Sequence, residues 1–347
     1  MNLVIKPTEA CNFSCSFCSS SNLVSDKKSR LDLQHIYDFL KRFPDTQSIF
    51  VVGGDPLMMP VDYYFAILKY IEDNNLPTKI SFTTNLWDFY KHPDKWNQLF
   101  AHPKMEIGTS FQYGDGRQIK PGVVFTEEKF IEIYNLFKKY HPNKSLSFLA
   151  VIDESNQSKA IDHVLLAKKL NTQCRLVYAN KSGKAGDTYP IGKMYQIYLT
   201  IWKMGLSEYE QTAYSIAETM NGFNVGCPLS RSCDSFMRSL NPDGRYFSCG
   251  PLNDDLDKDN EIDFKSEMNG AFHTPIQSSK YQFLKPECFG CKMFSLCNGC
   301  RKHIKDLQLT NKVEENCKAM KSIEKDILEM SNTPEIKEFF LYGKDFN

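Results

Sequence analysis

Two spacings of apolar residues alternate along the first 205 positions of this 347-residue chain. Short runs rich in β-branched or aromatic residues are typical of buried strands, and the stretches between them have the three-to-four-residue spacing of amphipathic helices. The predicted strands cover residues 3–6, 48–52, 79–84, 105–111, 145–152 and 174–178. The predicted helices cover residues 31–43, 61–73, 94–101, 126–140, 158–170 and 189–205.

Six strand–helix units in succession predict a parallel sheet with helices packed outside it. A full barrel needs eight units, so we predict an α/β fold with a partial (β/α)6 TIM barrel over residues 1–205. Active sites of parallel α/β folds lie at the carboxyl ends of the strands. The loops that follow the predicted strands are therefore the places to look for functional side chains.

The pattern changes after the sixth unit. Residues 206–226 are predicted to form a connecting helix. Over residues 227–317 the strand and helix signals are short, cysteines are dense, and loop residues dominate 241–260, which predicts a second, smaller domain. We expect a last helix over about 314–330, so that residues 318–347 form a C-terminal helix and tail.

Composition narrows the function classes. The chain has 42 basic and 42 acidic residues, a balance that argues against a nucleic-acid surface or a polybasic membrane patch. No apolar run is long enough to predict a transmembrane helix, and no signal peptide is visible at the N-terminus. Twelve cysteines without a secretory signal predict a reducing, cytoplasmic location in which they bind metal or clusters.

Three of these cysteines lie in the loop after the first predicted strand. Cys11, Cys15 and Cys18 have the spacing C-x3-C-x2-C, and the aromatic residue Phe17 stands directly before the third. Three thiolates so close together can hold three corners of a cubane 4Fe–4S cluster and leave the fourth iron without a protein ligand. An open iron is a binding position for a substrate or cosubstrate, so this motif points to chemistry.

The motif resembles that of the radical S-adenosylmethionine (SAM) superfamily, in which SAM chelates the open iron. The resemblance implies that an electron from the cluster cleaves SAM to methionine and a 5′-deoxyadenosyl radical. It also implies an external electron donor such as flavodoxin or ferredoxin, and anaerobic or low-oxygen conditions. The alternative is that three unrelated buried cysteines lie near the N-terminus.

The resemblance extends to the ends of the next strands. Gly53, Gly54, Asp55 and Pro56 follow the second strand and resemble the family's GGEP motif, with Asp in place of Glu. They would bind the amino group of SAM, although the same four residues alone are an ordinary turn signal. The remaining candidates for SAM contacts are Phe17 and the polar residues that end strands three and four, Thr83, Thr84, Asn85, Ser110 and Gln112.

Eight further cysteines resemble the C-terminal SPASM domain of radical SAM maturases, which carries two auxiliary 4Fe–4S clusters. The family's ligation pattern would assign the first auxiliary cluster to Cys227, Cys233, Cys249 and Cys300. It would assign the second auxiliary cluster to Cys288, Cys291, Cys297 and Cys317.

The chain departs from the family pattern at one point, because two residues rather than three separate Cys297 from Cys300. The partition of these two cysteines between the clusters is therefore open. The alternative is a pair of zinc sites, for which paired C-x2-C motifs are normal. Zinc ribbons usually separate the pairs by more than the five residues seen here, and they leave Cys227, Cys233 and Cys249 without a role.

Two fully ligated auxiliary clusters would have no open iron, which favours electron transfer over substrate ligation. The sequence therefore predicts a net two-electron oxidation, most simply a cross-link between side chains of a peptide or protein, as in maturases of ribosomal peptides. No N-terminal leader-binding module precedes the first strand, so we expect a separate leader-binding protein, another surface for the leader or a substrate without one. Aromatic residues at the barrel mouth could line a substrate pocket or pack in the core: Trp87, Phe89, Tyr90, Phe111 and Tyr113.

Other reactions fit the sequence less well. Epimerisation needs a free thiol near the substrate, whereas the leftover Cys174 begins the sixth strand, far from the carboxyl ends, and is expected to be a buried structural thiol. Sulfatase maturation relatives carry an Asp directly after the position of Cys249, where this chain has Gly250. We expect Asp254 and Asp255 to lie in a solvated loop. A radical dehydrogenase or carbon–carbon bond former acting on a metabolite, and a non-catalytic metal-binding protein, remain alternatives.

Overall fold

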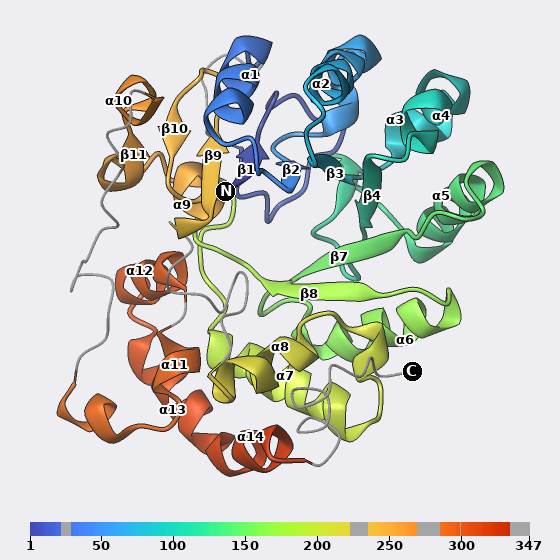
Figure 1. Ribbon diagram of the computed structural model, residues 1–347. Coiled ribbons are helices and arrows are strands. Elements are labelled where there is room, and N and C mark those ends of the chain that lie inside the picture. Colours follow the sequence, from blue (N-terminus) through green and yellow to red (C-terminus); the bar gives the residue numbers. More distant parts are fainter. Residues whose placement is uncertain (22–28, 223–234, 269–284, 299, 334–347) are drawn as a thin grey trace. The chain divides into compact units, whose positions relative to one another are not determined.

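The computed structural model describes residues 1–21, 29–222, 235–268, 285–298 and 300–333 (Figure 1). Contacts divide the chain into two compact units. Unit one comprises residues 1–150, 181–186 and 232–276, and unit two comprises residues 151–180, 187–231 and 277–347. The domain boundaries predicted from the sequence stay a prediction, because this division follows contacts rather than function.

The parallel sheet of unit one contains the predicted strands in the predicted order. Its strands β1 to β4 are Asn2–Ile5, Ser48–Val51, Lys79–Thr84 and Met105–Ser110, followed by β7, Ser147–Ile152. Each strand pairs in parallel with the next along this series. The α/β fold with a parallel sheet is therefore confirmed.

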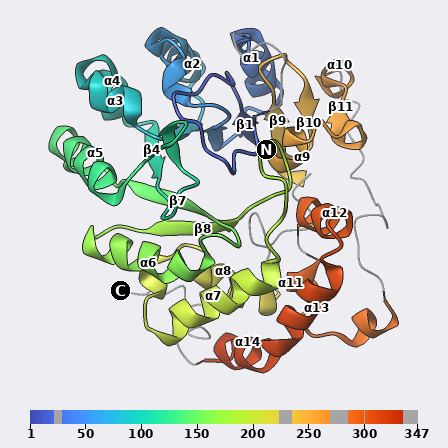
Figure 2. The same cartoon turned by 180° about the vertical axis from the view of Figure 1, so that it is seen from behind.

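Helices cover the outer side of these strands in both views (Figures 1 and 2). The predicted helices form as α1 (Leu33–Arg42), α2 (Val61–Asp73), α4 (Pro93–Ala101) and α5 (Glu127–Tyr140). Asp32 and Thr126 cap α1 and α5 by accepting hydrogen bonds from backbone N–H groups of the first turn. The apolar faces of these helices bury large aromatic side chains such as Phe39 and Phe137.

Unit one also contains elements that the sequence did not predict. The sheet continues past β1 through β9 (Met237–Leu240), β10 (Tyr246–Phe247) and β11 (Glu261–Ile262). β9 runs parallel to β1. The expected loop over 241–260 is thus partly wrong, because it holds β10 and the short helix α9 (Gly250–Asp254). Strands of two to four residues carry too little periodicity to be recognised from the sequence.

Three further short elements lie between the predicted ones. The helix α3 (Trp87–Lys91) follows β3. A hairpin of β5 (Gln118–Lys120) and β6 (Val123–Val124) follows β4. α10 (Phe264–Met268) follows β11, and its buried Glu267 forms an ion pair with the buried Arg238 of β9.

Unit two contains the last strand, β8 (Cys174–Tyr178), and a set of helices. The predicted helices form as α6 (Ala160–Lys169) and α7 (Ile191–Lys203). The predicted connecting region holds α8 (Ala213–Met220). The cysteine-rich part of this unit forms α11 (Phe294–Cys297), α12 (Arg301–Leu309), α13 (Val313–Ser322) and α14 (Glu324–Ser331).

The single helix expected over about 314–330 is two helices. Ile323 ends α13 and caps α14. The hydroxyl of Ser322 donates to the carbonyl of Ala319 at 2.8 Å, a local side-chain bond of the kind that competes with regular helix geometry. Among the described residues, no helix combines the length and apolarity needed to cross a membrane.

Glu210 is a buried carboxylate that ties β8 to the start of α8. It accepts hydrogen bonds from the backbone N–H groups of Leu176, Thr212 and Ala213 at 2.8 to 3.0 Å. Burial nevertheless raises the pKa of this carboxyl group from 4.5 to about 7. The folded chain therefore binds a proton more tightly at this position than the unfolded chain does.

We expect the Glu210 carboxyl group to lower the stability of the folded state as pH rises. Between about pH 4.5 and 7, Glu210 is protonated in the folded state but ionised in the unfolded state. The free energy of unfolding therefore falls by on the order of 3 kcal/mol as pH rises across this window. Glu210→Gln should flatten this dependence, although it loses one backbone hydrogen bond. Thermal unfolding midpoints of anaerobic, cluster-loaded protein at pH 5.5 and pH 8 measure the effect. The exposed Glu208→Gln is the control, and an equal pH slope in both variants would contradict the assignment.

Candidate functional site

The loop of Cys11 to Cys18, here called the cysteine loop, is held by residues 112–118, which follow β4 and are here called the strap. The backbone N–H of Ser14 donates to Gln118 at 2.8 Å, and that of Ser16 donates to Gly116 at 2.9 Å. A Cβ atom on Gly116 would lie 3.1 Å from the Phe17 ring and the Ser16 hydroxyl. Glycine at this position therefore lets the strap lie flat against the cysteine loop.

The three thiols of the cysteine loop lie close enough to influence one another. Cys11 keeps solvent contact, while Cys15 and Cys18 are partly buried. Loss of hydration by the surrounding atoms, together with the nearby Asp55, Cys15 and Cys18, raises the pKa of Cys11 to about 12. Burial also raises the pKa of Cys18. Three such thiolates are unfavourable together unless a cation or a metal cluster compensates their charge.

Arg117 in the strap is the compensating cation, and its side chain is only 6% exposed. Burial lowers the pKa of its guanidinium, whereas Cys15, Cys11, Cys18 and Asp55 raise it. The guanidinium carbon lies 5.4 Å from the centre of the Phe17 ring. Its Nε atom and the Oε1 atom of the buried Gln112 have no hydrogen-bond partner in the described part of the chain.

These observations fit a negatively charged group bound at the cysteine loop. The donor set of three thiols suits a 4Fe–4S cluster with one open iron, and a buried arginine with an unpaired N–H beside it suits the negative charge. Arg117 was not predicted as a site residue, because one arginine in a glycine-rich loop gives no sign that it is buried. Gln112 was predicted as a site residue, and it lies in the same strap.

Gly53 and Gly54 have a structural reason to be glycines. Gly53 has φ +112°, and a Cβ atom on Gly54 would lie 2.2 Å from the carbonyl oxygen of Ala10. The N–H groups of Gly54 and Asp55 donate to Thr8 and Ala10 at 3.0 and 2.8 Å. The loop after β2 is therefore packed backbone to backbone against the chain that leads into Cys11.

Asp55 is buried and links the ends of β2 and β3. Its carboxylate accepts from the Leu57 N–H at 2.9 Å, the Thr84 hydroxyl at 3.0 Å and the Asn85 N–H at 2.8 Å. Burial raises the pKa of this carboxyl group despite the bonds. The carboxylate is engaged within the protein, so a contact of Gly53–Pro56 with SAM stays a prediction that concerns the backbone.

The other predicted SAM contacts lie at the strand ends, as expected from the fold. The Asn85 side-chain amide donates to Asn12 of the cysteine loop at 2.7 Å, so β3 and this loop are directly joined. Thr83 is partly exposed, and Ser110 is buried at the end of β4. The structure thus brings Asn85 to the cysteine loop, while the roles of Thr83, Asn85 and Ser110 toward SAM stay predictions.

Asp254 corrects an expectation of the sequence analysis. It was expected in a solvated loop, but it ends α9, and its carboxylate forms an ion pair with the buried Lys6. It also accepts hydrogen bonds from the hydroxyls of Ser19 and Ser20, both at 2.9 Å. Asp255 is not free in solvent either, because it accepts from the hydroxyl of Ser182.

Four of the later cysteines form a second group inside unit two. Cys288, Cys291 and Cys317 lie near enough to Cys297 to raise its pKa, which burial brings to about 12. This set is the one that the family pattern assigns to a single auxiliary cluster. A donor set of four neighbouring thiols fits a fully ligated 4Fe–4S cluster.

The remaining cysteines that the structure describes each stand at the start of a different helix or strand. Cys227 and Cys233 lie outside the described residues. Cys249 stands at the start of α9 in unit one, and Cys300 stands at the start of α12 in unit two. Cys174 is fully buried at the start of β8, and burial raises its pKa strongly, as expected for a structural thiol.

Within the described ranges, no three His, Cys, Asp or Glu side chains are arranged to hold a single metal ion. A zinc site gathers its ligands around one ion, whereas a cubane cluster binds each thiolate to a different iron.

Aromatic residues at the strand ends divide into two groups. Phe89 and Phe111 are fully buried and pack against core rings such as Phe100 and Phe130. These two belong to the core. Trp87, Tyr90 and Tyr113 are partly exposed, and Trp87 contacts Phe13 of the cysteine loop at 5.9 Å between ring centres.

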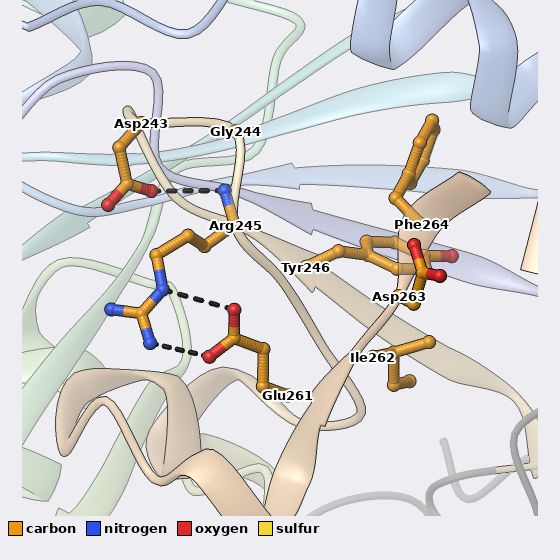
Figure 3. A pocket seen from close by; sticks show the side chains of 8 residues that line it. All are labelled: Asp243, Gly244, Arg245, Tyr246, Glu261, Ile262, Asp263 and Phe264. Atoms are coloured by element: carbon orange, nitrogen blue, oxygen red, sulfur yellow. Dashed lines mark hydrogen bonds and ion pairs between the residues drawn. The ribbon is translucent and has the colours of Figure 1, made fainter. Parts of the chain in front are cut away.

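A separate surface hollow in unit one holds none of the predicted site residues. It is lined by residues 243–246 and 261–264, and Figure 3 shows the Arg245 guanidinium pointing at the Glu261 carboxylate. The two groups form hydrogen bonds of 2.6 and 3.3 Å. The Arg245 and Glu261 side chains of this hollow thus pair with each other.

Comparisons with known proteins agree with the fold. The sequence model described as the Radical SAM superfamily matches residues 5–167. No curated protein matches the chain. Native anSMEcpe with bound AdoMet has a TM-score of 0.73 and 16% identity, over 96% of this chain and 99% of that one.

Two further structures carry peptides. Native anSMEcpe with bound AdoMet and Cp18Cys peptide has a TM-score of 0.66 and 18% identity, over 95% of this chain and 98% of that one. Streptococcus suis SuiB bound to precursor peptide SuiA has a TM-score of 0.60 and 16% identity, over 86% of this chain and 71% of that one. At such identities the likeness shows the fold alone.

Gly54→Ala should disrupt the site more than a glycine replacement elsewhere in the same unit. The added Cβ would meet the Ala10 carbonyl oxygen at 2.2 Å, so the chain before Cys11 must move, at a cost on the order of 3 kcal/mol. We expect loss of the iron bound by the cysteine loop and a lower thermal midpoint. Gly186→Ala is the control, because nothing lies within 4 Å of its Cβ position. Equal iron content in both variants would refute the packing argument.

Arg117→Met should make the cluster of the cysteine loop harder to reduce. The variant keeps similar bulk but removes the positive charge that stabilises the more negative, reduced state. We expect the ratio of reduced to oxidised cluster at a fixed ambient potential to fall about tenfold, which for one electron is about 59 mV. Potentiometric titration followed by electron paramagnetic resonance measures this ratio, with Arg117→Lys as the charge-retaining control. A shift of the same size in both variants would show that shape, not charge, matters.

Proposed function

Because the Radical SAM superfamily model matches residues 5–167, we propose that this protein is a radical SAM oxidoreductase that oxidatively modifies a peptide or protein side chain, most simply by forming a cross-link. The observation that carries the proposal is the presence of two distinct thiol sets in one chain. Cys11, Cys15 and Cys18 leave one iron open, whereas the set around Cys297 supplies four thiols to one cluster.

The proposed cofactors are SAM and three 4Fe–4S clusters. The cysteine loop would hold the cluster that binds SAM, with contacts from Phe17, Gly53–Pro56, Thr83, Asn85 and Ser110. When bound, this pair supplies a 5′-deoxyadenosyl radical that removes one hydrogen atom from the substrate. The first auxiliary cluster is assigned to Cys227, Cys233, Cys249 and Cys300, and the second to Cys288, Cys291, Cys297 and Cys317.

The protein must also take up a second electron from the substrate. A cross-link joins two groups that each lose one hydrogen, so one hydrogen atom leaves to the radical and the other leaves as a proton and an electron. The four thiols around Cys297 would fully ligate one cluster, which would then accept that electron and offer no open iron to the substrate. A flavodoxin or ferredoxin would supply the electron that starts the reaction.

A peptide or protein is the proposed substrate, in agreement with the peptides bound by SuiB and by anSMEcpe, whose fold this chain shares. A separate protein could present the leader of such a peptide. Epimerisation is less favoured, because the buried Cys174 cannot return a hydrogen atom to a substrate. A radical dehydrogenase or carbon–carbon bond former acting on a metabolite is the second candidate, since partly exposed Trp87 and Tyr113 lie at the strand ends that surround the cysteine loop.

Iron content and SAM cleavage test the cofactor assignment. Anaerobically purified protein should hold about twelve iron atoms and release deoxyadenosine with SAM and dithionite. Cys11→Ala should hold about eight and release none, because the auxiliary thiols remain. Colourless protein that contains zinc, or unchanged SAM cleavage in Cys11→Ala, would sink the proposal.

Co-expression with peptides encoded beside the gene tests substrate and reaction together. Mass spectrometry should find one peptide that loses about two mass units, with a linkage visible in its fragments. The same peptide should be unmodified with Cys11→Ala. A product of unchanged mass would exclude net oxidation, and modification of a metabolite instead of any peptide would favour the second candidate.

A further inference from the structure

The N-terminus of α7 is capped by side chains from elsewhere in unit two. Its own N-cap residue, Pro190, makes no side-chain cap. Instead, the N–H of Ile191 donates to Nε2 of His303 at 3.1 Å, and the N–H of Gly192 donates to Oδ1 of Asn316 at 2.9 Å. These two residues thus satisfy N–H groups that the helix leaves unpaired at its positive end.

Close packing fixes Asn316 in this role. Asn316 lies on α13 and is fully buried. A Cβ atom on Gly192 would lie 2.8 Å from the Ala319 side chain and 2.9 Å from the backbone oxygen of Asn316, so α7 and α13 touch at this glycine. His303 is held neutral, since burial lowers its pKa to about 3, so it adds no charge to the contact.

The other end of the Asn316 amide points at a cysteine. Its Nδ2 atom donates to the Sγ atom of Cys297 at 3.5 Å, within the range for a bond to sulfur. This bond favours the thiolate and lowers the pKa of Cys297, against the effects of burial and of the three neighbouring thiols. The amide therefore links the first turn of α7 to one thiol of the four-cysteine set by two hydrogen bonds.

We propose that Asn316 sets the reduction potential of the cluster held by Cys288, Cys291, Cys297 and Cys317, by donating a hydrogen bond to the Cys297 sulfur while α7 polarises its amide. The inference rests on the proposed function for the existence of that cluster. Hydrogen bonds to cluster sulfurs and nearby positive charge both raise a reduction potential, because they stabilise the more negative reduced state. Asn316 is thus a positioning residue that makes this cluster a better acceptor for the substrate electron.

Two substitutions separate the hydrogen bond from the helix cap. Asn316→Asp keeps an acceptor for the Gly192 N–H but replaces the donor with a negative charge beside Cys297. Asn316→Ala removes both bonds without adding charge. Ser322→Ala is the matched control, because it removes the Gln196–Ser322 hydrogen bond between the same two helices, on their exposed side.

Potentiometric titration of holoenzyme, followed by electron paramagnetic resonance, measures the effect. The signal of this cluster is identified by its loss in Cys291→Ala. In Asn316→Ala we expect the ratio of reduced to oxidised cluster at a fixed potential to fall about tenfold, which is about 59 mV for one electron. The fall should be larger in Asn316→Asp, and Ser322→Ala should match the unaltered protein.

Each outcome decides the proposal. An unchanged potential in either fully loaded Asn316 variant overturns it. Loss of the cluster's iron in both variants also overturns it, since Asn316 would then act in assembly. If Cys291→Ala changes neither the iron content nor the signals, the cluster assignment itself fails, and that result is distinct from an unchanged potential.

Discussion

The contact between the backbone of Gly53–Gly54 and the chain before Cys11 is the constraint on which the site depends. The N–H groups of Gly54 and Asp55 donate to the carbonyl oxygens of Thr8 and Ala10, and no side chain at Gly53 or Gly54 would fit in the contact. Asp55 then carries the constraint to β3 through Thr84 and Asn85. Three strand ends are thereby fixed to one another before any cofactor binds, which is the preorganisation that a loop with three metal ligands requires.

Clustered thiolates in both units repel one another, and nearby groups of two different kinds stabilise their charge. At the cysteine loop a formal cation, Arg117, stands beside the three thiols. Around Cys297 the described neighbours supply an amide donor, Asn316, which is joined to the positive end of α7. A full charge stabilises added negative charge more than a dipole does. The difference suits the proposed roles, in which the first site binds a cosubstrate that carries a carboxylate and the second only receives electrons.

The alternation of strands and helices over residues 1–205 could be predicted from sequence, because each of these elements has enough residues to show its periodicity. Cys11, Cys15 and Cys18 were recognisable because their ligands lie within eight residues of one another. Arg117 and Asn316 were not, since their roles arise from burial against segments far away in sequence. Asp254 was misjudged for the same reason, because nothing near it in sequence indicates its ion pair with Lys6.

The Lys6–Asp254 ion pair lies between two segments of unit one, which contain Cys18 and Cys249. The family pattern gives these two cysteines to different clusters. Cys249 is the N-cap residue of α9, and Asp254 is its last residue, so Cys249 and Asp254 are separated by one short helix. The Asp254 carboxylate holds Ser19 and Ser20, directly after Cys18, and Lys6 also donates to the Gly250 carbonyl at 3.2 Å. Breaking a buried ion pair by removing one partner costs about 3–5 kcal/mol. The ion pair and its neighbouring hydrogen bonds therefore fix the residues after Cys18 relative to the short helix that Cys249 precedes.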